Sequence, residues 1–336
     1  MAVNKNMEDW ILDPNQLKQW ATELRALYLN GDPFPHIVID DFLPDDNAHE
    51  IASAYPAIDS NGKWRVGDEV FQKRKRGFSE LHLMPTCIRN ALFQLNSPMM
   101  LTFLEELTGE GPLIPDPYMS GGGLQQTTSG GYLKVHHDFQ KHQIFGLDRK
   151  INFLLYLTPG WNKSYGGAIE LWNRQMDQCV QRIFPKFNRC VIFTTDRHSY
   201  HGLPDPICCP DSMSRRSIAL YYWGMPKAEV DFSKINKVYD DMYSTWHQRP
   251  GESFPNEVMP GWLPPGAEDP FMEEGKRAEV SGSEDLTIGV ATTIDQSNKS
   301  SKQLMLDHLP HVLVKALVTC KRALGKITRL QGKRDE

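Results

Sequence analysis

The chain has 336 residues, of which 40% are hydrophobic and 24% charged, and its formal net charge at pH 7 is -5. These values suit a folded protein with a substantial core, and the acidic balance gives no indication of a nucleic-acid partner. No apolar run reaches the ~18 residues of a membrane-spanning helix, and the opening MAVNKNMEDWILDP lacks the apolar core of a signal peptide. Six scattered cysteines without a C-x-x-C pair predict a reduced, cytoplasmic protein with neither disulfides nor a cysteine zinc site.

The first third of the chain mixes helical and strand patterns. Residues 14–29 have apolar residues at helical spacing, which predicts a helix within an N-terminal segment of residues 1–30. PFPHIVIDDFLP then predicts a short β-strand bounded by prolines, and DDNAHEIASAYP the start of a capped helix. The basic run at residues 73–76 favours a solvated loop, with a contact to an acidic partner or substrate as the alternative.

From about residue 112, short β-rich runs alternate with glycine, proline and asparagine turns. The runs are GYLKVHHDF, INFLLYLTPGW, GGAIELWN, NRCVIFTTD and RRSIALYYW. This spacing predicts a β-sandwich or barrel rather than a β-α-β sheet. No helix with a phosphate-binding pattern follows the glycine-rich MSGGGLQQTTSGG, so we expect a mobile loop at the rim of a site there, not a nucleotide loop.

The strand pattern fades near the end of the chain. We expect residues 226–263 to form an extension that packs on the domain, and the polar residues 264–302 to form a flexible linker. Residues 303–332 return to helical spacing with many basic side chains. This basic amphipathic helix suits a packing or oligomer contact, with a membrane surface or a partner protein as the alternative.

The stretch GGYLKVHHDF carries the strongest indication of chemistry. Because side chains alternate along a strand, His136 and Asp138 share one face and His137 points away. A third ligand to a cation would come from TTDRHSYHGLPDP, which offers His198 and His201. Two histidines and one carboxylate leave three positions open on an octahedral iron, which is the facial triad of non-haem Fe(II) oxygenases. Taken alone, H-x-D also fits a surface strand with polar residues.

A possible anion anchor follows fourteen residues beyond His201, in RRSIALYYW. Arg215 and Ser217 share a strand face, and together they can hold a carboxylate through a charge-assisted pair and a hydroxyl. A cation here suits 2-oxoglutarate, whose oxoacid end chelates iron while its far carboxylate needs a positive partner. Arg216 is the alternative anchor, but alternation favours Arg215 because Ser217 then joins it.

The β-rich runs, the H-x-D stretch, His201 and the RRS stretch follow one another between about residues 112 and 224. Together they resemble the Fe(II)/2-oxoglutarate-dependent dioxygenase superfamily, in its prolyl 4-hydroxylase-like branch. PFPHIVIDDFLP is similar to the N-terminal strand and helix start of that branch. The resemblance implies a mainly β (α+β) fold, a double-stranded β-helix or jelly roll over residues 31–225, buttressed on one side by helices.

The resemblance also implies roles for individual residues. The implied metal ligands are His136, Asp138 and His201. The implied 2-oxoglutarate contacts are Arg215, Tyr156, Ser217 and Gln126. No catalytic side chain beyond the iron ligands is implied, and His137 and His198 are left outside the site.

The implied activity is hydroxylation of an unactivated C–H bond with Fe(II), 2-oxoglutarate and O2, and with ascorbate as a reductant. A prolyl residue of a peptide or protein is the first choice of substrate, and a free amino acid or a small natural-product metabolite is the alternative. A catalytically silent metal-binding jelly-roll scaffold remains open, although Arg215 beside an intact triad argues against it. A cupin-type hydrolase or isomerase that uses another metal is a further alternative, although such sites usually carry more histidines than the two of this triad.

Overall fold

The computed structural model describes residues 10–58, 64–226 and 244–253. Within these ranges the α-helices are α1 (Pro14–Leu29), α2 (Asp45–Ser53), α3 (Thr86–Leu95) and α4 (Pro98–Thr108), with short 3-10 helices η2 (Leu81–Leu83) and η3 (Lys163–Tyr165). The strands are β1 (His36–Ile39), β2 (Arg65–Gly67), β3 (Gln72–Phe78), β4 (Leu113–Pro115), β5 (Gly123–His137), β6 (Asp148–Tyr156), β7 (Ile169–Trp172), β8 (Cys179–Ile183), β9 (Arg189–Thr194), β10 (His201–Leu203), β11 (Arg215–Gly224) and β12 (Thr245–Trp246).

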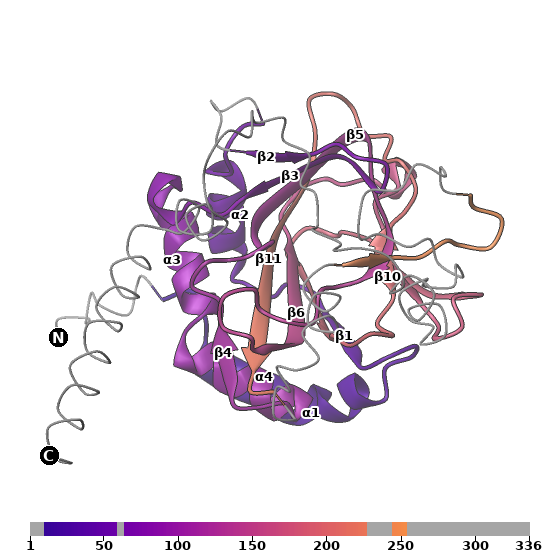
Figure 1. The fold of residues 1–336 in the computed structure, drawn as a ribbon. Coiled ribbons are helices and arrows are strands. Elements are labelled where there is room, and N and C mark those ends of the chain that lie inside the picture. The colour runs from indigo at the N-terminus through magenta and orange to yellow at the C-terminus, as the bar shows by residue number, and fades with distance from the viewer. Residues whose placement is uncertain (1–9, 59–63, 227–243, 254–336) are drawn as a thin grey trace, which may run out of the picture. The chain divides into compact units, whose positions relative to one another are not determined.

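The strands form one curled antiparallel sheet in the order β1-β9-β6-β11-β5-β10-β7-β8. The long strand β5 joins its two halves, because its first part pairs with β11 and its last part with β10. β3 lies along the other edge of β5, and β12 pairs with the end of β5 (Figure 1). The sheet therefore folds onto itself as a double-stranded β-helix, and the predicted fold class, mainly β with flanking helices, is confirmed.

Alternation along the strands separates a core face from a cavity face. The side chains on the core face pack into one buried cluster with the helices: Ile151, Phe153, Leu155, Cys190, Ile192, Ile218, Leu220 and Tyr222. Figure 1 shows α1–α4 gathered on one side of the sheet. Each fully buried aliphatic or aromatic side chain of this kind contributes roughly 1.5–3 kcal/mol to stability. The intervening residues of the same strands face the opposite way, into the cavity described below.

The first helix begins and ends where its sequence pattern predicts. The Asp13 side chain caps α1 by accepting a hydrogen bond from the backbone N–H of Asn15 at 2.8 Å, and Pro14 occupies the first turn. Near its end, the buried Tyr28 hydroxyl lies 2.7 Å from the Thr194 hydroxyl, which ties the helix to β9. The predicted side-chain cap of α2 is absent, because its N-cap residue is Pro44. Asp45 and Asp46 instead face the positive end of the α2 dipole.

Two loop predictions are wrong. The basic run at residues 73–76 lies in strand β3, which is held between β2 and β5. Most of MSGGGLQQTTSGG lies in β5, because its backbone pairs with β11 on one side and β3 on the other. The predicted linker at 264–302 and the basic helix at 303–332 lie outside the described residues. In the described part of the chain, we find no helix long and apolar enough to cross a membrane.

Candidate metal and co-substrate site

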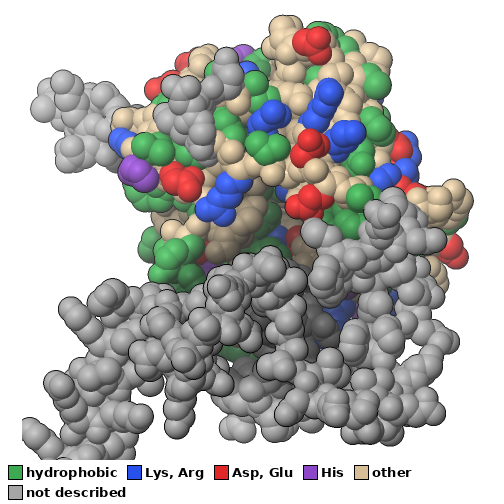
Figure 2. Space-filling model, turned by 45° about the horizontal axis from the view of Figure 1, so that its top comes forward, with side chains coloured by type: hydrophobic (Ala, Val, Ile, Leu, Met, Phe, Trp, Pro, Cys, Tyr) green, Lys and Arg blue, Asp and Glu red, His purple; other side chains and the backbone are tan. Residues whose placement is uncertain are grey.

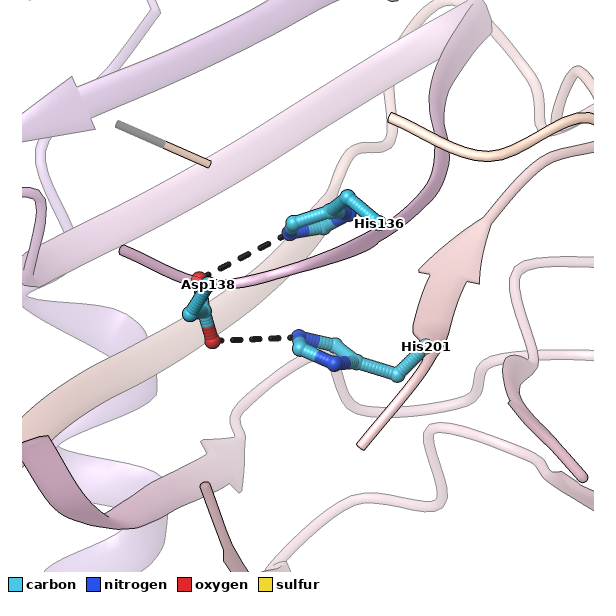
Figure 3. Close-up of side chains that lie close together, drawn as sticks. All are labelled: His136, Asp138 and His201. Carbon is cyan, nitrogen blue, oxygen red and sulfur yellow. Dashed lines mark ion pairs between the residues drawn. The ribbon is translucent and has the colours of Figure 1, made fainter. Parts of the chain in front are cut away.

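Three buried side chains meet where β5 and β10 lie side by side. His136 is paired with His201 across the two strands, and Asp138 follows the end of β5 (Figure 3). The Nε2 atoms of His136 and His201 lie 3.6 and 3.3 Å from the two carboxylate oxygens of Asp138. One ligand atom from each residue lies within 4.8 Å of the others, so the set can hold a single metal ion.

Backbone carbonyls determine which ring nitrogen of His136 and of His201 faces Asp138 and a metal bound between them. His136 Nδ1 lies 2.9 Å from the Lys134 carbonyl oxygen, and His201 Nδ1 lies 2.8 Å from that of Ser199. A carbonyl oxygen only accepts, so each Nδ1 carries a proton, and Nε2 is the ring nitrogen that is directed toward Asp138 and can bind a metal. Burial lowers the pKa of His136, which favours the neutral form that binds metals.

Two neighbours on β6 hold the Asp138 carboxylate in its ionised form. Asn152 Nδ2 donates to Asp138 Oδ2 at 2.6 Å, and a terminal guanidinium nitrogen of Arg149 lies 3.1 Å from the same oxygen. Burial alone would raise the pKa of Asp138, but the charge of Arg149 and the contacts to the two histidines outweigh it and lower the pKa well below its usual range. The Arg149 guanidinium is itself fully buried, 3.4 Å from the centre of the Tyr221 ring.

The triad opens into a cavity of about 250 Å³. Apolar side chains line part of the wall next to the metal ligands, among them Leu154, Ile169 and Phe193. Trp246 on β12 closes another part, with its ring centre 5.0 Å from that of His136. The polar wall consists of side chains from β3, β5 and β11: Gln72, Lys75, Gln125, Thr127, Arg215 and Ser217.

Arg215 is the arginine of the RRS sequence that faces this cavity. Its Nε donates to the Gly167 carbonyl oxygen at 2.7 Å, and its NH2 donates to the Tyr156 hydroxyl at 3.1 Å. Gly167 has φ +84°, and an added Cβ would lie 3.3 Å from Arg215 Cδ, so glycine allows this close backbone approach. Ser217 follows on the same face and is buried. Arg216 faces the other way, where its Nε donates to the Ser214 hydroxyl at 3.3 Å.

The other two predicted co-substrate contacts, Tyr156 and Gln126, do not line the cavity. Tyr156 is fully buried behind Arg215 and contributes to the site only by accepting the hydrogen bond that positions the Arg215 guanidinium. Burial raises the pKa of the Tyr156 phenol. Gln126 faces away from the cavity, where its Oε1 accepts from the Ser214 hydroxyl at 2.9 Å. This position argues against the predicted contact, and Gln125 and Thr127 line the cavity instead.

The two remaining histidines of the motif stretches lie apart from the triad. His137 Nδ1 lies 3.0 Å from His247 Nε2, and its ring packs near Tyr200. The ring of His198 lies beside Arg174, with 3.3 Å between His198 Nε2 and the nearest guanidinium nitrogen. Neither residue belongs to the group of possible metal ligands within the described part of the chain.

The sequence reasoning missed several residues around the site. Lys75 was assigned to a solvated loop, yet it lines the cavity from β3. Arg149 and Asn152 were not singled out, although strand alternation from Tyr156 would have placed Asn152 on the cavity face. Trp246 lies beyond the run of recognisable strands, and we find no sequence signal that connects it with His136.

The donor set fits Fe(II). Two imidazoles and one carboxylate on one side of a cavity match the facial set that binds non-haem Fe(II) and leaves further coordination positions open. The hydrogen bonds from His136 and His201 to carbonyls, and from Asn152 to Asp138, are the outer contacts that orient such ligands.

Comparison with known families gives a match. Residues 122–223 match the family model of the 2OG-Fe(II) oxygenase superfamily. The matched range includes the triad, Tyr156, Arg215 and Ser217.

Among curated proteins, the mouse prolyl 3-hydroxylase OGFOD1 is 31% identical over 210 residues, which cover 59% of this chain and 34% of the mouse protein. The Xenopus laevis protein of the same name is 31% identical over 80 residues, 23% of this chain and 15% of the frog protein. The chain therefore matches about a third of the length of the first relative and less of the second.

Among solved structures, similarity extends to a Trichoplax adhaerens prolyl hydroxylase in complex with a peptide of the hypoxia inducible factor oxygen degradation domain. The TM-score is 0.47 at 18% identity, over 62% of this chain and 91% of that one. HygX from Streptomyces hygroscopicus, with nickel, 2-oxoglutarate and hygromycin B bound, has a TM-score of 0.40 at 11% identity, over 60% of this chain and 87% of its own.

Proposed function

We propose that this chain is an Fe(II)- and 2-oxoglutarate-dependent dioxygenase that hydroxylates a prolyl residue of a peptide or protein. The observation that carries the proposal is that one cavity contains both a buried two-histidine, one-carboxylate set and a fixed arginine. The match of residues 122–223 to the 2OG-Fe(II) oxygenase superfamily supports the same chemistry.

In this proposal, His136, Asp138 and His201 hold Fe(II) through their Nε2 and carboxylate atoms. Burial favours the neutral form of His136, and the charge of Arg149 favours the ionised form of Asp138, and these are the forms that bind metal. Arg149 and Asn152 keep the carboxylate oriented through contacts of 3.1 and 2.6 Å.

Arg215 binds the far carboxylate of 2-oxoglutarate. Its two hydrogen bonds, to Gly167 and Tyr156, hold the guanidinium plane in place, so little side-chain entropy is lost when the anion arrives. The hydroxyl of Ser217 on the same strand face is a second donor to that anion. The neutral Tyr156 phenol positions Arg215 from behind.

Fe(II), when bound with 2-oxoglutarate and O2, supplies the oxidising chemistry that converts 2-oxoglutarate to succinate and CO2 and adds a hydroxyl group to the substrate. The side chains contribute binding and orientation, and we assign no general acid or base among them. Leu154, Ile169 and Phe193 restrict water beside the triad. Trp246 covers His136 on the side of β12.

The choice of a prolyl residue rests on the 31% identity with the mouse prolyl 3-hydroxylase. Ascorbate as the reductant that maintains Fe(II), and a cytoplasmic location, are further parts of the proposal. The location is supported by the described cysteines, which are all free.

The proposal is tested by incubating the purified protein with Fe(II), 2-oxoglutarate, ascorbate, O2 and a panel of prolyl peptides. We expect succinate to form, and one or more peptides to gain an oxygen atom at proline by mass spectrometry. Succinate without any prolyl product would retain the oxygenase and reject the prolyl substrate. No succinate from folded, iron-loaded protein, with or without peptide, would reject the oxygenase itself.

A further inference from the structure

Lys75 and Arg215 belong to one row of side chains across three adjacent strands. Lys75 on β3 pairs with Thr127 on β5, and Arg215 on β11 pairs with the same Thr127. Residues directly opposite one another in antiparallel strands project to the same face of the sheet. All three side chains accordingly line the one cavity, with the two cations on either side of Thr127.

The charges that line this cavity do not balance. Among the described lining residues, Lys75 and Arg215 are the Lys and Arg side chains, and Asp138 is the carboxylate. The Asp138 carboxylate is already 3.1 Å from a guanidinium nitrogen of Arg149, behind the wall. Two positive charges therefore face the cavity without an anion of their own.

Lys75 faces the cavity and has no ion-pair partner among the described residues, unlike Arg65 on the outer surface. On the face drawn in Figure 2, Lys and Arg side chains stand beside Asp and Glu, and Arg65 on β2 lies 3.6 Å from Glu80. No ion pair or hydrogen bond joins the Lys75 ammonium to another described residue. Burial lowers its pKa, the charge of Asp138 opposes this, and Arg149 and Arg215 add to the lowering. An ammonium group in such a place is stabilised by a bound anion.

The chemistry of the proposed reactants identifies the anion. A prolyl side chain is uncharged and offers Lys75 no partner. 2-Oxoglutarate is a dianion, and its negative charge is attracted both by the metal at its oxoacid end and by the unpaired cations of the wall. Lys75 also lies on the same three-strand wall as Arg215, whereas Ser244 and Trp246 line the cavity from the segment that pairs with the end of β5.

We propose that Lys75 is a second co-substrate-binding cation, which acts with Arg215 to bind 2-oxoglutarate. This inference rests on the proposed function. It adds a residue from β3, outside the matched range of 122–223, to the co-substrate site. The two cations of the wall add their attraction for the dianion to that of the metal, so the loss of either one should weaken the binding of 2-oxoglutarate.

The test is calorimetric titration of 2-oxoglutarate into protein loaded with Mn(II) in place of Fe(II), so that no turnover consumes the ligand. The variants are Lys75→Met and, in case that variant folds poorly, Lys75→Gln. The matched control is Lys73→Met, because Lys73 is an exposed residue of the same strand. Thermal unfolding and Mn(II) binding are measured for each protein, so that a loss of folding or of metal is recognised.

We expect the Kd for 2-oxoglutarate to rise about 10- to 100-fold in both Lys75 variants, as for the loss of a charge-assisted hydrogen bond, and to stay unchanged in the control. Folded Lys75 variants that bind 2-oxoglutarate within about twofold of the wild-type affinity would overturn the inference and leave the proposed function standing. Wild-type protein that binds Mn(II) but no 2-oxoglutarate would overturn both.

Discussion

Replacing Arg215 or Arg216 by methionine distinguishes the roles of these two adjacent arginines, which face opposite sides of β11. Arg215 lines the cavity and is held by the Gly167 carbonyl oxygen and the Tyr156 hydroxyl. The Arg216 guanidinium lies on the helix side, 5.4 Å from the centre of the Tyr55 ring. Methionine keeps much of the length of arginine and removes the charge, so the pair of variants compares one lost charge in two places.

From the structure we expect Arg215→Met to weaken 2-oxoglutarate binding and Arg216→Met to lower stability. A hydrogen bond to a charged group contributes about 1.5–3 kcal/mol, so Arg215→Met should raise the Kd for 2-oxoglutarate about 10- to 150-fold. Arg216→Met should leave that Kd within about twofold of the wild-type value and lower the unfolding free energy by about 1 kcal/mol through the contacts it loses. Calorimetric titration of Mn(II)-loaded protein and thermal unfolding measure the two effects. A larger affinity loss for Arg216→Met would move the anchor by one residue and refute the assignment of faces.

Three further variants test the triad and the surface. His136→Ala should lose the metal and His137→Ala should keep it, as measured by metal content after dialysis, and the reverse result would mean that the strand register is wrong. Asp40→Asn removes a carboxylate whose pKa is lowered chiefly by the hydrogen bond from Arg189. The stability difference from wild type, below about 1 kcal/mol at this partly exposed site, should be present above the ordinary pKa of 3.8 and vanish as the pH falls below it. A difference in thermal unfolding that grows toward acid pH would contradict this sign.

Much of the fold could be predicted because its strands have one apolar face. In β6 and β11 the core residues recur at every second position, and the glycine and proline turns between runs are frequent. The bounds of α1 follow from its apolar spacing and from Asp13 and Pro14 at its start. Strand β3 was not predicted because QKRKR, its first five residues, is polar on both faces: part of it is exposed, and Lys75 faces the cavity.

The site could be predicted only where strand alternation is unbroken. Counting back from His136 in steps of two reaches Gln126, but β5 is irregular between Leu133 and His136, where two residues of β5 lie opposite one residue of β10. This bulge reverses the faces, so Gln125 and Thr127 line the cavity and Gln126 does not. No such irregularity lies between Arg215 and Ser217, and there alternation correctly favoured Arg215 over Arg216 for the cavity face.

The central claim is that His136, Asp138 and His201 hold Fe(II) beside bound 2-oxoglutarate. Its most direct test is anaerobic addition of Fe(II) and 2-oxoglutarate to the purified protein, while the visible spectrum is recorded for the weak charge-transfer band of an iron–2-oxoglutarate chelate. We predict that the band appears in the wild type and is absent in His201→Ala. Correctly folded wild-type protein that binds Fe(II) but develops no band at saturating 2-oxoglutarate would contradict the account.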